Sequence, residues 1–184
     1  MKISGLKFTF KIILIGDGRV GKTTLIQKFT QGAFQEDYIK TIGAQFSVYD
    51  KEIDRDKVKL LFWDIAAQDD FNFARPSFFK NSKAAIIVYS LEENDLGAES
   101  FNHISNWYED VIQFCGNIPV VLFANKVDLI DEKTLDHSNI QELVEDLNIL
   151  RYYITSAKTG QGVIKAFNFI IDKLHHDNKV FLIE

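Results

Sequence analysis

The sequence is poor in three features that would each point to a different class of protein. Its 184 residues include one cysteine, Cys115, which excludes an internal disulfide, gives no support for a multi-cysteine metal site and fits a reducing cytosol. No apolar run reaches the roughly eighteen residues that a transmembrane helix needs. The net charge of −5 comes without a basic stripe, which argues against nucleic-acid binding through the phosphate backbone.

Targeting and lipidation signals are also missing from both ends of the sequence. The apolar residues near the N-terminus run directly into a glycine-rich segment and form no signal peptide. Position 2 is Lys2 rather than the glycine that N-myristoylation requires, and residues 181–184 contain no cysteine for prenylation. We therefore expect a cytoplasmic protein with no intrinsic membrane anchor in this chain, which reaches a membrane only through a partner or through residues outside this sequence.

Apolar residues are plentiful enough for one packed core. They make up 46% of the chain and include 16 phenylalanines, so a disordered chain is excluded. The length favours one domain, residues 1–184, with a short C-terminal tail at 176–184.

Strand-like and helical patterns alternate along the chain, which predicts right-handed crossovers and a mostly parallel sheet. The expected strands are 7–15, 44–51, 57–65, 84–89, 119–123 and 151–154. The expected helices are 22–30, 99–115, 139–146 (beginning with a capping box of Ser138 and Gln141) and 163–174. The predicted fold class is therefore α/β, with about six strands, one antiparallel edge strand from a hairpin turning at 54–56, and helices on both faces. Residues 31–43 are predicted to form a long loop, and 66–80 an irregular segment.

A glycine-rich segment between the first strand and the first helix carries the strongest motif. Residues 16–23 match the phosphate-binding pattern G-x-x-x-x-G-K-[ST], and a chance match in a chain this size is rare, roughly one per cent. Glycines let backbone N–H groups surround an anion, and the helix N-terminus adds its dipole. Lys22 can reach the terminal phosphates, and Thr23 can ligate Mg²⁺. The residues expected to contact the nucleotide here are Gly16, Gly18, Arg19, Val20, Gly21, Lys22, Thr23 and Thr24.

Three downstream segments stand at the ends of predicted strands, where they meet the phosphate loop. Asp64 is placed to hold Mg²⁺ through water, although on its own it would read as a turn cap. Asp128 can accept two hydrogen bonds from guanine, which adenine cannot offer, and this disfavours an ATP-dependent phosphoryl-transfer enzyme. Asn125 can contact the base and tie its loop to the phosphate loop, and the stem of Lys126 can lie along the base. Residues 155–160 can present backbone amides to the base carbonyl, although alone they would be only a turn.

Taken together and in this order, the motifs resemble the Ras superfamily of small GTPases, most closely its Rab and Ras branches. The resemblance rests on residues 16–23, Thr41, 64–68, 125–128 and 156–158 and extends over about residues 8–175. It implies a P-loop NTPase fold. Residues 38–43 followed by Phe46, and Trp63 before Asp64, look more Rab-like than Ras-like, whereas Ala44 and Gln45 depart from the usual Rab residues.

The resemblance also implies a role for each matching residue. Lys22 would bind the β- and γ-phosphates, and Thr23, Thr41 and, through water, Asp64 would hold Mg²⁺ beside GTP or GDP. Gln68 would orient the attacking water, so Gln68, Lys22 and Thr41 are the expected catalytic residues. The other expected nucleotide contacts are Phe34, Tyr38, Ala67, Asn125, Lys126, Asp128, Ser156, Ala157 and Lys158.

One departure from the family pattern leaves two interpretations open. Ala67 stands where the family has a glycine whose amide donates to the γ-phosphate. The Cβ of alanine disfavours positive φ at a cost on the order of 1 kcal/mol. Either the turn stays at negative φ and the protein is a GTP/GDP switch with slow intrinsic hydrolysis, or it is a non-cycling nucleotide-bound scaffold. Gly18 argues for the switch, since it leaves room for Gln68 and for an incoming arginine.

Partners are expected at the two segments that respond to the γ-phosphate. By resemblance, effectors, exchange factors and activating proteins would bind through residues 34–46 and 66–80, and the protein is expected to be a monomer. The acidic segment 90–99 is a few residues longer than usual and is predicted to be a solvated surface loop. Solvated or packing roles are expected for the four scattered histidines, and a core position for Cys115.

Overall fold

A seven-stranded sheet forms the centre of the molecule, which is described here from a computed structural model covering residues 5–31, 35–39, 44–65 and 75–181. The strand order is β2-β3-β4-β1-β5-β6-β7. The strands are β1 (Lys7–Ile15), β2 (Gln35–Ile39), β3 (Ala44–Ile53), β4 (Asp56–Ile65), β5 (Ala84–Ser90), β6 (Val120–Asn125) and β7 (Arg151–Thr155). The helices are α1 (Lys22–Thr30), α2 (Arg75–Phe79), α3 (Asp95–Asn102), α4 (Ile104–Cys115), α5 (His137–Asp146) and α6 (Val163–Phe181), with short 3₁₀ turns at Val127–Leu129 and Glu132–Thr134.

The sheet is parallel over five strands and antiparallel at one side. β1 pairs in parallel with both β4 and β5, and the parallel pairing continues through β6 to β7. β3 runs antiparallel to β4, and β2 antiparallel to β3. The predicted fold class is confirmed, with β2 as a seventh strand inside the segment 31–43 that was predicted to be a loop. An edge strand needs backbone pairing on one side only, so its sequence does not have to carry the apolar pattern of an inner strand.

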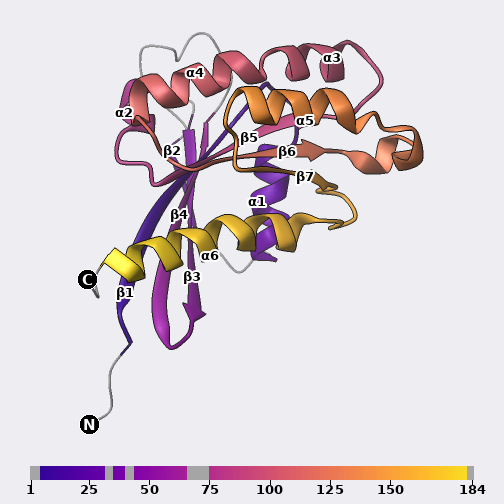
Figure 1. The fold of residues 1–184 in the computed structure, drawn as a ribbon. Helices are drawn as coiled ribbons and strands as arrows, with labels where there is room; N and C mark the ends of the chain where they lie inside the picture. Colours follow the sequence, from indigo (N-terminus) through magenta and orange to yellow (C-terminus); the bar gives the residue numbers. More distant parts are fainter. Residues whose placement is uncertain (1–4, 32–34, 40–43, 66–74, 182–184) are drawn as a thin grey trace.

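Helices cover both faces of the sheet and divide the core into two layers. Figure 1 shows α3, α4 and α5 on one side of the sheet and α1 and α6 on the other. Phe29 of α1 stacks on Phe167 of α6, with ring centroids 4.5 Å apart, above the sheet residues Phe62 and Phe123. All seven residues of β5 and all six of β6 are buried, as their uninterrupted apolar runs predict.

Three predicted helix boundaries are wrong, and two predicted irregular or loop segments are partly helical. One of them is 66–80, which contains α2 at Arg75–Phe79. The predicted helix 99–115 is two helices that meet at His103, and the first begins at Asp95, so half of the predicted loop 90–99 is helical. Asn94 explains that early start, because its side chain accepts a hydrogen bond from the Gly97 amide. The cap of α5 is Asp136, which accepts from the amide of Ser138, rather than Ser138 itself. Helix α6 extends to Phe181 and therefore includes most of the segment 176–184 that was predicted to be a tail.

The predicted hairpin turn is present, and it leads into a buried ionic cluster. Asp54 and Arg55 connect β3 to β4 with φ of 49° and 72°, the signs that a two-residue primed turn requires. Asp56 follows and is buried, with its side chain 5% exposed. Its carboxylate accepts hydrogen bonds from the Leu6 amide at 2.8 Å, His175 Nε2 at 2.9 Å and Lys179 Nζ at 2.8 Å.

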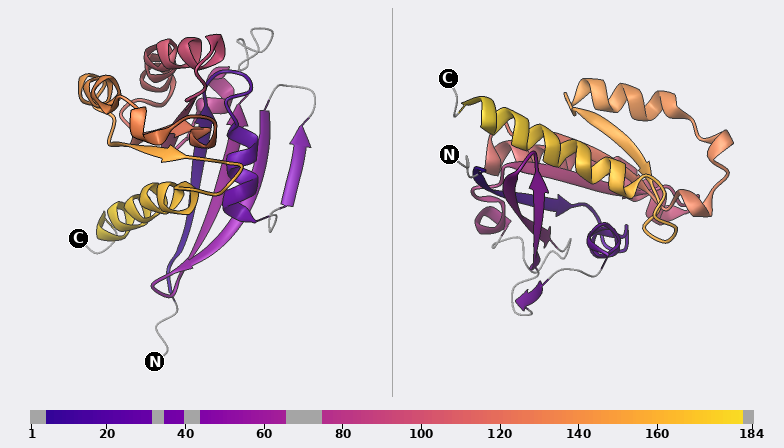
Figure 2. Two further views of the ribbon diagram at one scale, coloured as in Figure 1. Left: turned by 90° about the vertical axis from the view of Figure 1, so that its right-hand side faces the viewer. Right: turned by 90° about the horizontal axis from the view of Figure 1, so that it is seen from below.

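Asp56 therefore ties the start of β1 and the end of α6 to the hairpin. These segments lie at the same end of the molecule, as the two views in Figure 2 show. Hydrogen bonds from Lys179, His175 and the Leu6 amide lower the pKa of Asp56 from 3.8 to about 2. No helix in the described part of the chain combines the length and apolar character that spanning a bilayer requires.

The Asp56 cluster predicts a specific response to acid. Because the folded pKa lies below the unfolded one, the stabilisation is complete above the unfolded pKa of 3.8 and is lost as pH falls toward about 2. Asp56→Asn should therefore lower the free energy of unfolding at neutral pH, and its deficit against the natural chain should shrink through that window. Urea unfolding at a series of pH values measures this difference. Asp54→Asn, in the same turn but exposed, is the control, and a deficit that did not change with pH would contradict the prediction.

Candidate functional site

The phosphate-binding loop lies between the end of β1 and the start of α1, where its glycines are needed for different reasons. Gly16 has a φ of 134°, and a Cβ there would lie 2.1 Å from the Val88 carbonyl oxygen. Gly21 caps α1 with a φ of 102°, and its Cβ would lie 2.4 Å from Asn125 Nδ2. Among the described residues, no atom lies within 4 Å of a Cβ built on Gly18. Close packing therefore requires glycine at the two ends of the loop but not at Gly18.

Lys22 places a buried ammonium group against the loop. It is 7% exposed, and its Nζ donates hydrogen bonds of 2.8 Å to the carbonyl oxygens of Gly16 and Asp17. Burial lowers the pKa of Lys22, and the nearby carboxylates of Asp64 and Asp17 oppose that shift. An ammonium held here by neutral carbonyls is suited to bind an anion that enters the loop.

Thr23, a predicted Mg²⁺ ligand, and Asp64, predicted to hold Mg²⁺ through water, are brought together by the pairing of β1 with β4. Leu14 lies opposite Asp64 in the parallel pair of β1 and β4, so the carboxyl ends of the two strands meet beside the loop. The Thr23 hydroxyl donates a hydrogen bond to Asp64 Oδ2. Burial raises the pKa of Asp64, while the Thr23 hydrogen bond and the charge of Lys22 act in the opposite direction.

This pair fits a magnesium ion that takes its other ligands from elsewhere. Hydroxyl and carboxylate oxygens are the donors that Mg²⁺ prefers, and a buried carboxylate gains from a neighbouring cation. Within the described residues no group of three or more His, Cys, Asp or Glu side chains could hold a metal. Mg²⁺ commonly uses one or two protein ligands together with substrate phosphates and water, so a hydroxyl from Thr23 and a water held by Asp64 are compatible with such a site.

Asn125 connects three loops through its buried amide. It is 1% exposed, and its Nδ2 donates to the Val20 carbonyl oxygen at 2.8 Å. Its Oδ1 accepts from Thr155 Oγ1 and from the Ala157 amide, each at 3.1 Å. The predicted tie between Asn125 and the phosphate loop is therefore present, and the same side chain also holds the loop that follows β7.

Asp128 lies at the far side of this junction. Its Oδ1 accepts a hydrogen bond of 2.5 Å from the Ser156 hydroxyl, and Lys158 Nζ lies 3.9 Å from its Oδ2. Lys158 is otherwise exposed, whereas Ala157 is buried. The parallel pairing of Asn125 with Thr155 brings the loops after β6 and β7 side by side. The sequence motifs 125–128 and 156–158 thus form one structural unit.

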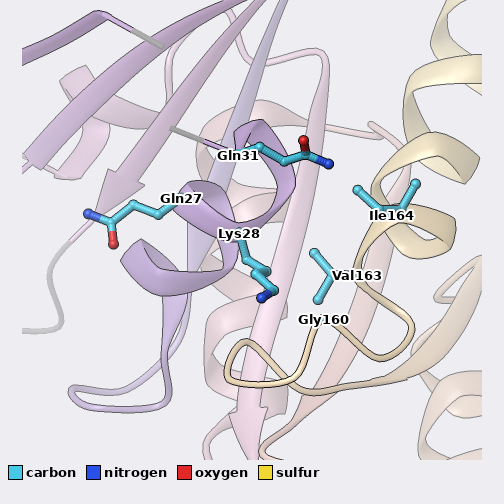
Figure 3. A pocket seen from close by; sticks show the side chains of 6 residues that line it. All are labelled: Gln27, Lys28, Gln31, Gly160, Val163 and Ile164. Atoms are coloured by element: carbon cyan, nitrogen blue, oxygen red, sulfur yellow. The ribbon is translucent and has the colours of Figure 1, made fainter. Parts of the chain in front are cut away.

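A small pocket beside α1 lies where Lys28 packs against the loop that follows β7. Figure 3 shows the Lys28 side chain extending from α1 toward the loop that contains Gly160, next to Val163 of α6. A Cβ on Gly160 would lie 2.9 Å from Lys28 Cε, so the lysine stem packs against this loop. The remaining lining residues, Gln27, Gln31 and Ile164, add no carboxylate and no further basic group.

The outer side of the phosphate loop has partners that the sequence analysis missed. Asp17 accepts hydrogen bonds from Trp107 Nε1 at 2.9 Å and from His103 Nδ1 at 2.7 Å. Arg75 lies over the Trp107 ring at 4.6 Å and pairs with Asp110 at 3.1 Å, so one indole touches both the loop and the start of α2. The helical spacing of Trp107 with Ile104 and Val111 could have indicated its inward position.

Glu92 is a further residue that sequence reasoning missed. It belongs to the segment predicted to be a solvated loop, yet its Oε2 lies 2.5 Å from Lys126 Nζ. Glu92 lies two residues beyond the buried strand β5, which pairs with β6, the strand that precedes residues 125–128. This position in the sequence could have indicated its contact with Lys126.

Several predicted site residues lie where the structure gives no side-chain description. Phe34, Thr41, Ala67 and Gln68 are outside the described residues, and Tyr38 belongs to β2, of which only the backbone is described. Arg19, with a φ of 63°, and Thr24 are exposed on the loop and on the first turn of α1. Their predicted nucleotide contacts remain predictions.

The two loop glycines give a matched test of this geometry. Gly21→Ala forces an alanine to positive φ and against Asn125, so it should lower the free energy of unfolding by at least about 1 kcal/mol. Gly18→Ala adds a Cβ that meets nothing within 4 Å in the described part of the chain, so it should be nearly neutral. Thermal unfolding with and without added GDP measures both effects, since ligand binding adds its own stabilisation. Equal losses in the two variants would contradict the assigned roles.

Comparison with known proteins agrees with this arrangement. A sequence model described as the Ras family matches residues 11–176. The GTP-binding protein ypt1 of Schizosaccharomyces pombe is 34% identical over 161 residues, which cover 87% of this chain and 77% of that protein. The Ras-related protein Rab-30 is 36% identical in Homo sapiens and in Bos taurus, over 169 residues that cover 91% of this chain and 80% of Rab-30. This chain belongs to the Ras family and is a Rab-like small GTPase.

Proposed function

We propose that this protein is a GTP/GDP switch that hydrolyses GTP slowly on its own. The observation that carries the proposal is the convergence at one edge of the sheet. Lys22, the Thr23–Asp64 pair and the Asp128–Ser156 pair lie at or just beyond the carboxyl ends of β1, β4, β6 and β7. Asn125 joins the segments that follow β1, β6 and β7. These groups match, in kind, the phosphates, the metal and the base of a guanine nucleotide.

In this proposal each part of the nucleotide has its own set of contacts. The amides of residues 16–24 and the ammonium of Lys22 hold the phosphates. Thr23 and Thr41 would ligate Mg²⁺, and Asp64 would orient a water on it, so that the ion could neutralise charge on the phosphate oxygens. Asp128 accepts the two guanine donors, with Phe34 and the stem of Lys126 on the faces of the base.

Hydrolysis and switching are assigned to the segments that flank the γ-phosphate. Gln68 orients the attacking water, and Thr41 together with the Ala67 amide responds to the γ-phosphate. Intrinsic rates of this kind are on the order of 10⁻⁴ per second, because charge stabilisation is incomplete without a partner's arginine. The proposed monomer would meet its effectors and regulators through residues 34–46 and 66–80, in the cytoplasm or at a membrane surface to which a partner brings it.

A second function is favoured by one residue. Ala67, where the family has glycine, would restrict the turn that responds to the γ-phosphate, and this supports a nucleotide-bound scaffold that does not cycle. The two functions share every contact to the base and to the β-phosphate. Hydrolysis therefore separates them, and nucleotide binding does not.

Asp128→Asn tests the base assignment. The change removes the charged acceptor of the two guanine donors, so the affinity for GDP should fall about tenfold or more while xanthosine diphosphate, which presents an acceptor instead, gains. Competition binding with GDP, XDP and ADP measures the shift, and Asp131→Asn, at a nearby exposed turn, is the control. Unchanged selectivity would overturn the role of Asp128, and adenine nucleotide released from the purified natural protein would overturn the guanine assignment.

Gln68→Leu and Ala67→Gly test the choice between switch and scaffold. For a switch, single-turnover hydrolysis should be measurable in the natural chain and at least about tenfold slower in Gln68→Leu, because the water loses its orienting group. Ala67→Gly restores the backbone freedom of the family motif and should hydrolyse GTP at least as fast as the natural chain. If the natural chain and Gln68→Leu are equally inert while both bind GTP, the scaffold function replaces the switch.

A further inference from the structure

We propose that Glu92 is a positioning residue for the base-binding loop and that it lengthens the time for which the nucleotide stays bound. The inference rests on the proposed function, since it concerns the same site, but it assigns a role to a residue outside all of the nucleotide-binding motifs. It corrects the expectation that segment 90–99 is a solvated loop, and it starts from the contact between Glu92 and Lys126.

Strand register explains why Glu92 reaches this loop. Ser90, the last residue of β5, lies opposite Asn125, the last residue of β6, and the Leu91 amide donates to the Asn125 carbonyl oxygen at 2.8 Å. Glu92 follows Ser90 by two residues, and Lys126 follows Asn125 directly, so both residues lie just beyond the ends of these neighbouring strands. Glu92 is therefore carried to the edge of the base-binding loop by the sheet itself.

The carboxylate of Glu92 is held in place from several sides. Its Oε2 accepts from the Ser90 hydroxyl at 2.9 Å, while the Glu92 amide lies 3.3 Å from Ser90 Oγ. The first turn of α3 packs on its backbone so closely that a Cβ on Gly97 would lie 1.8 Å from the Glu92 carbonyl oxygen. Hydrogen bonds from Lys126 and Ser90 lower the pKa of Glu92, so the group is ionised at neutral pH.

The Glu92 carboxylate holds the side chain of Lys126 in place. Its Nζ lies 2.5 Å from Glu92 Oε2, and both side chains are only about one-fifth exposed, at 22% and 21%. Its backbone has a φ of 71°, a conformation that a lysine adopts only when its surroundings hold it there. Glu92 fixes the far end of the side chain, so the stem is preorganised in one direction beside Asp128 rather than sampling its many rotamers.

The consequence is expected in the rate of nucleotide release. Affinity differences among variants of one site appear mainly in the dissociation rate. A side chain that is already held in its bound conformation avoids the conformational-entropy cost of being ordered on binding. Loss of the Glu92–Lys126 ion pair, whose side chains are mostly buried, should raise the dissociation rate roughly tenfold. Glu92→Ala should therefore release a fluorescent GDP analogue about tenfold faster than the natural chain, with Glu92→Gln between the two.

Glu93→Gln is the matched control. It removes one negative charge from the adjacent, exposed position, and it should release the analogue at the natural rate. An equal acceleration in Glu93→Gln and Glu92→Gln would show an effect of net charge alone and would overturn the positioning role.

A double-mutant cycle separates positioning from simple support of the loop. Lys126→Met keeps an apolar stem but removes the ammonium that Glu92 holds. If Glu92 acts through Lys126, then Glu92→Ala should have almost no further effect on dissociation in the Lys126→Met background. If the full acceleration persists there, Glu92 acts only on the fold of residues 90–97 and the inference is wrong.

The outcomes also distinguish this inference from the proposed function. If the natural chain binds no guanine nucleotide, the proposed function fails. If it binds GDP and Glu92→Ala releases it at the natural rate, only the role of Glu92 fails. Thermal unfolding of each variant at saturating GDP shows that the compared proteins are folded.

Discussion

The buried amide of Asn125 is the contact on which the rest of the site depends. At the carboxyl end of the inner strand β6, it makes hydrogen bonds with the Val20 carbonyl, the Thr155 hydroxyl and the Ala157 amide. Each of these groups would otherwise be a buried polar group without a partner, at a cost of about 1–3 kcal/mol. Val20 belongs to the phosphate loop, Asn125 ends β6, and Thr155 and Ala157 lie at the end of β7 and in the loop after it, so one side chain sets the distances among these three segments. Gly21 is glycine for the same reason, since any side chain there would displace the amide.

The charged groups of the site are held in an environment that favours a charged ligand. Lys22 is buried against neutral carbonyls, and Asp64 is buried with a hydroxyl as its hydrogen-bond partner. Burial lowers the pKa of Lys22 and raises the pKa of Asp64, and the opposite charges of the two groups partly offset these shifts. A phosphate beside Lys22 and a cation beside Asp64 would each relieve the cost of this burial. The parallel pairing of β1 with β4 brings the carboxyl ends of the two strands together and so fixes where these two charges lie.

The parts of the fold that the sequence predicts well are those in which burial dictates the residue type. The apolar runs of β1, β5 and β6 are buried on both faces, so their strands could be located closely, and the glycine spacing of the phosphate loop follows from its backbone geometry. The secondary-structure prediction is wrong where a single local contact determines where an element forms or begins. Strand β2 is an edge strand placed by its backbone pairing with β3, and α3 begins early because one asparagine caps it.

The same distinction holds in the site. Lys22, Asp64, Asn125 and Asp128 could be found because motifs specify them, and the structure brings Thr23 to Asp64 and Ser156 to Asp128. Glu92, His103 and Trp107 could not be found in that way, since no motif contains them. Their partners lie 34, 86 and 90 residues away in the chain, and only the folded sheet brings them together.

Trp107 gives the molecule an optical property of its own. The chain has two tryptophans, and the indole N–H of Trp107 points at the carboxylate of Asp17 within the phosphate loop, while Arg75 covers its ring. Indole emission responds to hydrogen bonding and to nearby charge. Any event that moves the loop or the start of α2 therefore changes the light that Trp107 emits, and the unlabelled protein carries a spectroscopic sensor for its own phosphate site.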